Sequence, residues 1–429
     1  MLNEKKTSAP ADRANMVAAT VFLLGVGTLL PWNFFMTASQ YFNQRLLPPP
    51  AANASSGATG ADYNYDSWMA LVSQLPLLLF TLLNSFLYRR VSERLRVAFS
   101  LVAIFLLFSL TAALVHVSME PPTFFTVTMA TIWCINMFSA VLQGSLFGLV
   151  GLLPPGYSTL FMSGQGLAGM FAAVAMLSSI LGNPDVESAA LGYFITPCVA
   201  TLGTLLCYLL LPHLTFARFH LSRRDEEEDT MKTKVLLSSA DEKERVSEDH
   251  GERSSVLLVF KKIWIMAACV TCVFAVTLSV FPAITVRVES VYTHSATWGH
   301  IFTCVCCFIV FNAMDLLGRS APSLAQWPPK DSWLFPAAVA SRLVFVPLLM
   351  TCNIPHSKLS VFFRHDAAFA AIMALFAFSN GYLASLCMAY APQLVRHKDC
   401  ETAGSLMTFF LVLGLAIGAA LSFLLVKLL

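Results

Sequence analysis

Charged residues are scarce in this chain. Asp, Glu, Lys and Arg make up only 12% of its 429 residues, about half of the ~25% that soluble domains carry. Hydrophobic residues make up 57%, which is more apolar surface than a soluble core absorbs, although a bilayer accepts it. The composition therefore excludes a soluble globular protein. We expect a membrane protein surrounded by the lipid bilayer, with no nucleic acid among its partners.

The arrangements of residues that are typical of disulfide, metal and catalytic sites are missing too. Ten of the eleven cysteines lie in apolar runs, so we expect small buried side chains rather than disulfides. Cys304, Cys306 and Cys307 lack a second pair at zinc spacing. The nine histidines lie outside the apolar runs or at their ends, and no Ser/His/Asp set appears. The chain is therefore predicted not to be an enzyme, and no cofactor or metal site is expected.

What the sequence does contain is eleven apolar runs, each near the ~20 residues that a helix needs to cross a bilayer. The first run, which begins near Met16, is too long for a signal peptide and has no small-residue cleavage site. Helices are expected, because an open sheet leaves its backbone unsatisfied in lipid. We predict an all-α polytopic protein with 11 transmembrane helices, at residues 16–41, 68–88, 97–117, 124–152, 157–181, 192–211, 262–286, 299–320, 335–352, 367–391 and 402–427.

One charged stretch divides these runs into six and five. The predicted regions are a cytosolic N-terminus at 1–15, a six-helix bundle at 16–211 with an extracellular loop at 42–67, a disordered cytosolic loop at 212–261 and a five-helix bundle at 262–429. The cytosolic loop is charged and poor in aromatic residues, a composition that buries no core. It is either a solvated linker or a regulatory loop, since Ser238 and Ser239 precede acidic residues and could accept phosphate.

Lys and Arg predict the orientation in the membrane. With the N-terminus in the cytosol, twenty-one of the 27 Lys and Arg residues fall in cytosolic segments and five in outer segments. An odd number of spans then places the C-terminus outside the cell. The only N-x-S/T sequon, at Asn53, falls in the predicted outer loop. We therefore expect a glycoprotein modified at Asn53.

Two opposite charges stand one helical turn apart in the eighth span. Asp315 and Arg319 share a helix face at i,i+4 spacing, and Asn312 extends this face by one turn. A charge at mid-bilayer costs about 2.5–3.5 kcal/mol on insertion scales. A carboxylate beside a guanidinium offers an acceptor and donors together, which suits the two hydroxyls of a vicinal diol. The alternative is a structural clamp near the cytosolic surface.

Other polar and aromatic residues in the spans leave two interpretations open. The Gln143 amide matches the edge of a nucleobase or of any planar amide, but it could also hydrogen-bond between helices. Trp32, which follows Pro31, is either a stacking wall or an interface anchor. The aromatic–proline pair recurs in the seventh span, where Phe281 and Pro282 could gate the outer mouth.

Acidic residues open the last span. Asp399 and Glu401 lie at its predicted start, where they complement the helix dipole. Glu401 could instead pair with a basic residue in a cytosolic gate. Arg342, an isolated charge in the ninth span, is the candidate partner.

A glycine motif in the fifth span has a packing interpretation. The segment Gly164–Gly169 matches the G-x-G-x-x-G of dinucleotide-binding proteins. That motif needs a preceding strand, whereas here it lies inside an apolar helix. We therefore interpret it as a site of close helix packing.

Several strings, in order along the chain, resemble the equilibrative nucleoside transporter family. They are Gly27–Phe35, Leu142–Gly148, Ser163–Gly169, Phe311–Asn312 followed by Asp315, Gly318–Ser320 and Phe378–Leu383. The resemblance covers nearly the whole chain, and Ser139 with the run Ser158–Ser163 is most similar to the second vertebrate member. It implies a 6+5 arrangement like that of the major facilitator proteins with one helix missing.

The resemblance also implies a role for each matching position. The substrate site would comprise Leu29, Trp32, Met36, Leu77, Gln143, Asn312, Asp315, Arg319 and Leu415. Within it, Gln143 would hydrogen-bond the base, whereas Asp315 and Arg319 would hold the ribose hydroxyls. The gate positions would be Phe281, Pro282 and Glu401. Two residues depart from the family pattern, since Leu316 replaces a common Trp and Ser139 replaces a Gly of the first member.

We therefore predict facilitated diffusion of nucleosides, and of nucleobases, across the plasma membrane. The transporter would be a monomer that works by alternating access. One alternative is a proton- or sodium-coupled nucleoside symporter, with Asp315 or Glu401 as the proton carrier. Another is a membrane receptor or enzyme that works through its cytosolic loop.

Overall fold

The computed structural model describes residues 10–46, 65–87, 91–182, 186–221, 255–292, 296–355 and 357–429. Asn53, Ser238 and Ser239 lie outside the described residues, as do most of the loops predicted at 42–67 and 212–261. The expectations about glycosylation, phosphorylation and loop disorder therefore stay predictions.

Helices overlap every predicted span. In the first half they are α1 (Met16–Thr37), α2 (Ser39–Leu46), α3 (Tyr65–Leu87), α4 (Glu93–Leu114), α5 (Pro121–Val150), α6 (Pro155–Gly182) and α7 (Val186–Leu210). In the second half they are α9 (Val256–Val280), α10 (Ala296–Phe302), α11 (Val310–Ser320), α12 (Leu334–Ser341), α13 (Phe345–Met350), α14 (Asp366–Tyr390) and α15 (Cys400–Leu428). Among the described residues, nine helices are long and apolar enough to cross a membrane, and Leu71–Phe86 and Leu334–Met350 are shorter apolar helices. The all-α prediction is confirmed.

Some helices differ from the predicted spans in length or continuity. The seven residues Thr303–Ile309 between α10 and α11 form a π-helix, and Arg342–Val344 between α12 and α13 forms a 3-10 turn. Apolar runs carry no signal for such changes of pitch. α9 ends at Val280 because Phe281 is extended, with φ −103° and ψ 130°, as a residue before proline prefers.

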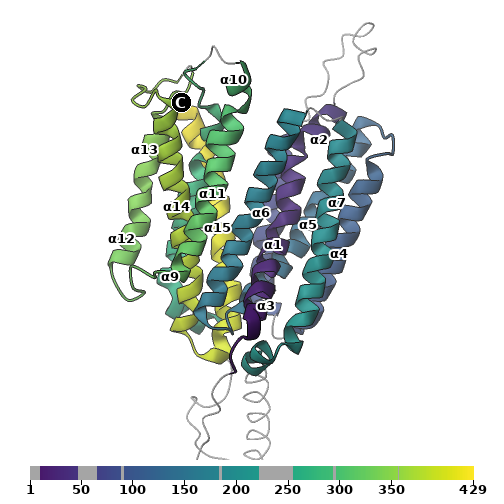
Figure 1. Cartoon of the computed structure of the whole chain (residues 1–429), viewed down its shortest axis with the longest axis vertical. Helices are drawn as coiled ribbons and strands as arrows, with labels where there is room; N and C mark the ends of the chain where they lie inside the picture. The colour runs from purple at the N-terminus through teal and green to yellow at the C-terminus, as the bar shows by residue number, and fades with distance from the viewer. Residues whose placement is uncertain are drawn as a thin grey trace, which may run out of the picture.

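The helices form two groups (Figure 1). Helices α1 to α7 lie together, which we call the N-terminal group, and α9 to α15 form the C-terminal group. The beginning of α1 and the C-terminus of the chain lie at opposite ends of the molecule (Figure 1). We call the end at which α1 and α15 begin the inner end.

Glycines allow α1 and α6 to pack with their backbones in direct contact. A Cβ at Gly25 would lie 2.1 Å from the Phe161 carbonyl oxygen, and a Cβ at Gly164 would lie 2.0 Å from that of Phe22. No larger residue fits at these contacts. The interpretation of the Gly164–Gly169 motif as close packing is thus confirmed at its first glycine.

The surface carries apolar stripes at helical spacing. One stripe of α4, 45–61% exposed, consists of Phe99, Val102, Leu106 and Leu110. A second stripe, on α7, consists of Val199, Leu202, Leu206 and Leu209. Steps of three and four residues keep each stripe on one helix face. Such continuous apolar faces are rare on soluble proteins and suit contact with hydrocarbon.

The α1–α6 contact predicts the effect of enlarging its glycines. Gly164→Leu should lower the melting temperature of the detergent-purified protein by several degrees, because overpacking forces the two helices apart. Gly203→Leu on α7 is the matched control, since nothing lies within 4 Å of a Cβ at Gly203. Equal melting temperatures for the two variants would contradict the assigned contact.

Candidate functional site

The charged pair of α11 faces the protein interior. The buried residues of this helix are Phe311, Asp315, Gly318 and Arg319, a spacing of four, three and one that defines a single face. Arg319 Nε donates to Asp315 Oδ2 at 2.6 Å. Only 4% of Asp315 and 7% of Arg319 are exposed. Sequence analysis thus located a real ion pair, and its burial means that other protein groups must replace water.

Helix α14 supplies one of those groups. Two glycines bring its backbone against α11, since a Cβ at Gly381 would lie 2.1 Å from the Asp315 carbonyl oxygen and a Cβ at Gly318 2.2 Å from that of Phe378. This approach places Asn380 beside the carboxylate, where Asn380 Nδ2 donates to Asp315 Oδ1 at 2.7 Å. The carboxylate therefore has a donor on each oxygen.

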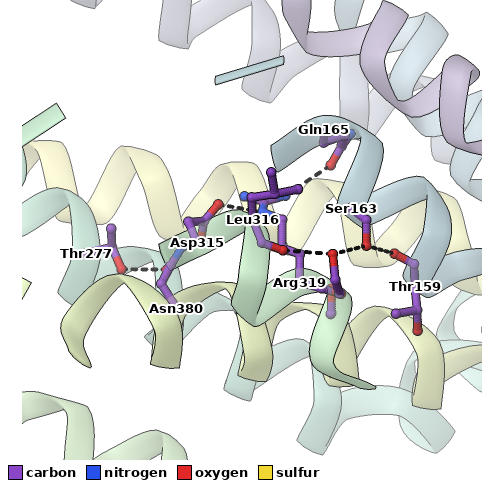
Figure 2. Close-up of polar contacts among 10 residues, drawn as sticks. Thr159, Ser163, Gln165, Thr277, Asp315, Leu316, Arg319 and Asn380 are labelled. Carbon is purple, nitrogen blue, oxygen red and sulfur yellow. Dashed lines mark hydrogen bonds and ion pairs between the residues drawn. The ribbon is translucent and has the colours of Figure 1, made fainter. Parts of the chain in front are cut away.

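The hydrogen-bond chain continues deeper into the C-terminal group. Thr277 on α9 donates its hydroxyl to Asn380 Oδ1 at 2.7 Å, and Figure 2 shows Thr277, Asn380, Asp315 and Arg319 in one line. Arg342 Nη2 in turn donates to Thr277 Oγ1 at 2.9 Å. Four elements of the group therefore contribute to one polar row.

Helix α6 of the N-terminal group lies on the other side of Arg319. Arg319 Nη1 donates to Gln165 Oε1 at 3.4 Å, and Gln165 Nε2 donates to Thr28 Oγ1 on α1 at 3.2 Å. One turn along, Ser320 donates to Ser163 Oγ at 3.1 Å (Figure 2). The charged pair thus lies where the two groups meet.

Two glycines of the α6 motif permit this meeting. A Cβ at Gly166 would lie 3.0 Å from Leu316 Cα. A Cβ at Gly169 would lie 2.2 Å from Asn312 Oδ1. The Asn312 side chain, whose amide donates to the Phe308 carbonyl at 2.8 Å, therefore reaches α6, as its place on the polar face predicted.

The ion pair keeps unused hydrogen-bonding capacity. A carboxylate can accept about four hydrogen bonds and a guanidinium can donate five. Within the described part of the chain, the Asp315 carboxylate accepts from Arg319 and Asn380, and the Arg319 guanidinium donates to Asp315 and Gln165. The remaining sites suit a ligand that both donates and accepts, such as a diol.

A second polar cluster joins the groups at the inner end. Arg96 Nη2 on α4 donates to Glu401 Oε1 on α15 at 2.8 Å, and Arg96 Nη1 donates to Asn84 Oδ1 on α3 at 2.8 Å. Asn84 Nδ2 and Ser85 reach Ser405 of α15 at 3.3 and 3.0 Å. We call Arg96, Asn84, Glu401 and Ser405 the inner latch.

The inner latch corrects one hypothesis. Arg342 was the candidate partner of Glu401, but Glu401 pairs with Arg96, and Arg342 lies in the polar row of the C-terminal group. Arg342 occupies the 3-10 turn of a broken span and is 1% exposed. Sequence spacing cannot relate residues on different helices, so the correct pairing was not predictable.

Gln143 lies close to the inner latch. Its neighbour Gly144 abuts Asn84, whose Nδ2 would be 2.7 Å from a Cβ at that glycine. Gln143 is 7% exposed, and among the described residues no hydrogen bond engages its amide. The amide is not among the fully buried polar atoms that lack a partner, so it remains open to a polar ligand.

The predicted apolar residues are spread over both groups. Leu29 packs in the α1–α6 contact, and Leu77 and Leu415 pack against the large core. Trp32 stacks on Phe35 with ring centroids 5.9 Å apart, whereas Met36 is 41% exposed. At a rise of 1.5 Å per residue, Leu77 on α3 lies about 10 Å farther from the inner end than Asn84. On α15, Leu415 lies about 15 Å farther from the inner end than Ser405.

Phe281 and Pro282 lie at the opposite end from the inner latch. Phe281 stacks on Phe311 of α11, with centroids 3.9 Å apart and an interplanar angle of 7°. The half-buried Phe281 thus packs one turn from Asp315 along α11, and Pro282 is exposed. One of the two expected gate residues, Phe281, is therefore linked to α11 by a ring contact.

Sequence analysis missed Gln165, Thr277 and Asn380 around the charged pair, and Arg96, Asn84 and Ser405 in the inner latch. Gln165, Thr277 and Asn380 lie in apolar runs, with no charged residue within two helical turns of them in the sequence. Arg96 resembled an ordinary residue of a cytosolic loop. Gln165 and Asn380 lie in strings that resemble the family, and this was the available signal for them. Their roles depend on contacts between helices.

The fold and the sequence match known transporters. The nucleoside transporter family model matches residues 129–427. A crystal structure of FucP, a major facilitator superfamily transporter in the outward conformation, aligns with a TM-score of 0.56 at 12% identity, covering 95% of this chain and 91% of that one. This likeness shows the fold, and a major-facilitator-like arrangement is confirmed.

Three relatives match over nearly the whole length of both chains. The chain is 50% identical to equilibrative nucleoside transporter 2 of Mus musculus and 51% identical to that of Homo sapiens, with 97% of this chain and 98% of each relative covered. It is 46% identical to equilibrative nucleoside transporter 1 of Homo sapiens over the same shares. The expected similarity to the second vertebrate member is confirmed. The chain belongs to the equilibrative nucleoside transporter family.

Proposed function

We propose that this protein carries nucleosides down their concentration gradient by facilitated diffusion. The observation that supports this most is the buried Asp315–Arg319 pair between the two helix groups, with unused acceptors and donors. A ribose must lose its hydration to enter an apolar passage, and unreplaced hydrogen bonds would cost several kcal/mol. The pair would replace them at the 2′- and 3′-hydroxyls, with Asn312 beside it.

Gln143 would bind the base. Gln143 is 7% exposed as a whole residue, and its amide has no hydrogen-bond partner among the described residues. An amide pairs with the donor and acceptor edge that purines and pyrimidines share. Because this contact needs no sugar, we propose free nucleobases as a second substrate class. Trp32, Leu29, Met36, Leu77 and Leu415 would cover the apolar faces of the substrate.

The inner latch and the α6–α11 contact would form the cytosolic gate. Both join the N-terminal group to the C-terminal group, through Arg96–Glu401 and Arg319–Gln165. A substrate can leave toward the inner end only when these contacts open. Phe281 and Pro282 would close the other end. Rocking of the two groups about the central pair would give alternating access.

We place the protein in the plasma membrane as a monomer with its inner end in the cytosol. The bias of Lys and Arg supports this orientation, and the two ends of the described chain lie at opposite faces (Figure 1). Residues 16–211 and 262–429 would be the two moving bundles. Asn53 would then carry a glycan on the outer face.

Uptake into proteoliposomes tests the proposed function. Purified protein should give saturable uridine entry that stops when the internal concentration equals the external one. An imposed proton or sodium gradient should not change this end point, because the proposed mechanism couples no ion. Accumulation above the external concentration would identify a symporter, and absence of uptake would refute nucleoside transport.

Asp315→Asn tests the ribose site. The substitution should raise the KM for uridine roughly 10- to 100-fold, the range expected when hydrogen bonds to a charged group are lost. The KM for a free base should change much less, because a base has no ribose. Asp331→Asn, in the exposed loop after α11, is the control. Equal losses for the nucleoside and the base would remove Asp315 from the ribose site.

Arg96→Gln tests the inner latch. Cys400 is buried beside Glu401, with a Cβ at Gly151 only 3.2 Å from the Cys400 carbonyl oxygen. Loosening the latch should increase labelling of Cys400 by a maleimide applied from the inner side, measured by mass spectrometry. Arg94→Gln, on the exposed face of α4, should have no effect, and combining Arg96→Glu with Glu401→Arg should restore protection. Unchanged labelling in Arg96→Gln would rule out the latch.

A further inference from the structure

We infer that Arg342 is a positioning residue for the substrate site, acting on Asp315 through Thr277 and Asn380. The inference rests on the proposed ribose-binding role of Asp315. Arg342 itself lies two side chains away from the carboxylate. The chain of hydrogen bonds, Arg342 to Thr277 to Asn380 to Asp315, measures 2.9, 2.7 and 2.7 Å.

The direction of every bond in this chain follows from Arg342. A guanidinium only donates, so the Thr277 hydroxyl must accept from Arg342 Nη2. The hydroxyl proton then has two acceptors in reach, the Val273 carbonyl at 2.9 Å and Asn380 Oδ1 at 2.7 Å. Arg342 Nη1 already donates to the Val273 carbonyl at 2.6 Å. Asn380 Oδ1 is the nearer acceptor and the Val273 carbonyl is already engaged, so Arg342 favours the orientation in which the hydroxyl proton points to Asn380.

This direction fixes the amide of Asn380. With Oδ1 accepting from Thr277, the Nδ2 end must face Asp315, and it donates to Oδ1 of that carboxylate. The reversed amide would place its oxygen against the carboxylate oxygen, a repulsive contact. Arg342, acting through Thr277, and the Asp315 carboxylate thus select the same amide orientation, in which Asn380 Nδ2 donates to Asp315 Oδ1 while Arg319 donates to Oδ2.

The surroundings of Arg342 support a role beyond packing. It is 1% exposed, and its other partners are the Ser379 hydroxyl at 3.1 Å and the Phe376 carbonyl at 3.3 Å, with the Phe376 ring 5.2 Å away. None of these is a carboxylate. A charge buried in this way is expensive, and Asp315 is the anion at the far end of its hydrogen-bond chain. The chain therefore couples the two charges.

The consequence concerns substrate selectivity. With a donor already on each oxygen, the Asp315 carboxylate offers a ligand only acceptor sites. A ligand must then present hydroxyl donors to it, as a ribose with free 2′- and 3′-hydroxyls does. A 2′,3′-dideoxynucleoside has none at these positions and gains nothing from an oriented Asp315. We call the hydrogen-bonded chain of Arg342, Thr277, Asn380 and Asp315 the relay. The relay would favour ribonucleosides over dideoxynucleosides.

Thr277→Val tests the relay, because valine has nearly the shape of threonine but no hydroxyl. It should raise the KM for uridine roughly tenfold, about the effect of losing one hydrogen bond to a charged group. The KM for 2′,3′-dideoxyuridine and for a free base should stay within about twofold, since these ligands do not use Asp315. Thr277→Ser should retain the wild-type ratio of the KM values.

Thr271→Val is the matched control on the same helix. The Thr271 hydroxyl bonds the Ala267 and Phe410 carbonyls and has no link to the relay. It should leave the KM ratio of uridine to dideoxyuridine unchanged, and melting temperatures would confirm that the variants fold. An unchanged ratio in Thr277→Val, or an equal rise for all three substrates, would overturn the relay. If Asp315→Asn still weakens uridine selectively, the relay falls while the proposed function stands.

Discussion

A carboxylate and a guanidinium buried inside a membrane protein need polar neighbours in place of water, and the inner half of this molecule is organised around that need. The Asp315–Arg319 pair receives Asn380 from one side and Gln165 from the other. One neighbour belongs to its own helix group and one to the opposite group. The same hydrogen bonds therefore stabilise the charges and hold the two groups together, so a ligand that takes over one side of the pair also weakens the contact between the groups.

Backbone contact makes these short side-chain bridges possible. Gly381 lets α14 reach α11 inside the C-terminal group, and Gly166 lets α6 reach α11 across the boundary between groups. In lipid, helices gain little from burying apolar side chains against each other, so close packing and hydrogen bonds carry the association. The polar contacts at the boundary vary in length, from 2.8 Å for Arg96–Glu401 to 3.4 Å for Arg319–Gln165, against 2.7 Å for Asn380–Asp315 inside the C-terminal group. The long Arg319–Gln165 bond is the one beside the charged pair, where a ligand would replace it.

The helical spans, the ion pair and the packing role of the Gly164–Gly169 motif were predictable, because each depends on spacing within one segment. The partner of Glu401, the role of Arg342 and the contribution of Asn380 were not. These depend on which helices lie side by side and on a 3-10 turn that an apolar run does not reveal. Interhelical geometry has no signature in a single sequence, whereas i,i+4 pairs and span lengths do.

A structure of the protein with uridine bound tests the central claim most directly. The account predicts ribose hydroxyls within hydrogen-bonding distance of the Asp315 carboxylate and the Arg319 guanidinium, with the Asn380 contact kept and the Arg319–Gln165 contact lengthened or lost. Uridine bound elsewhere, with the 2.6 Å ion pair and its Gln165 contact unchanged, would contradict it.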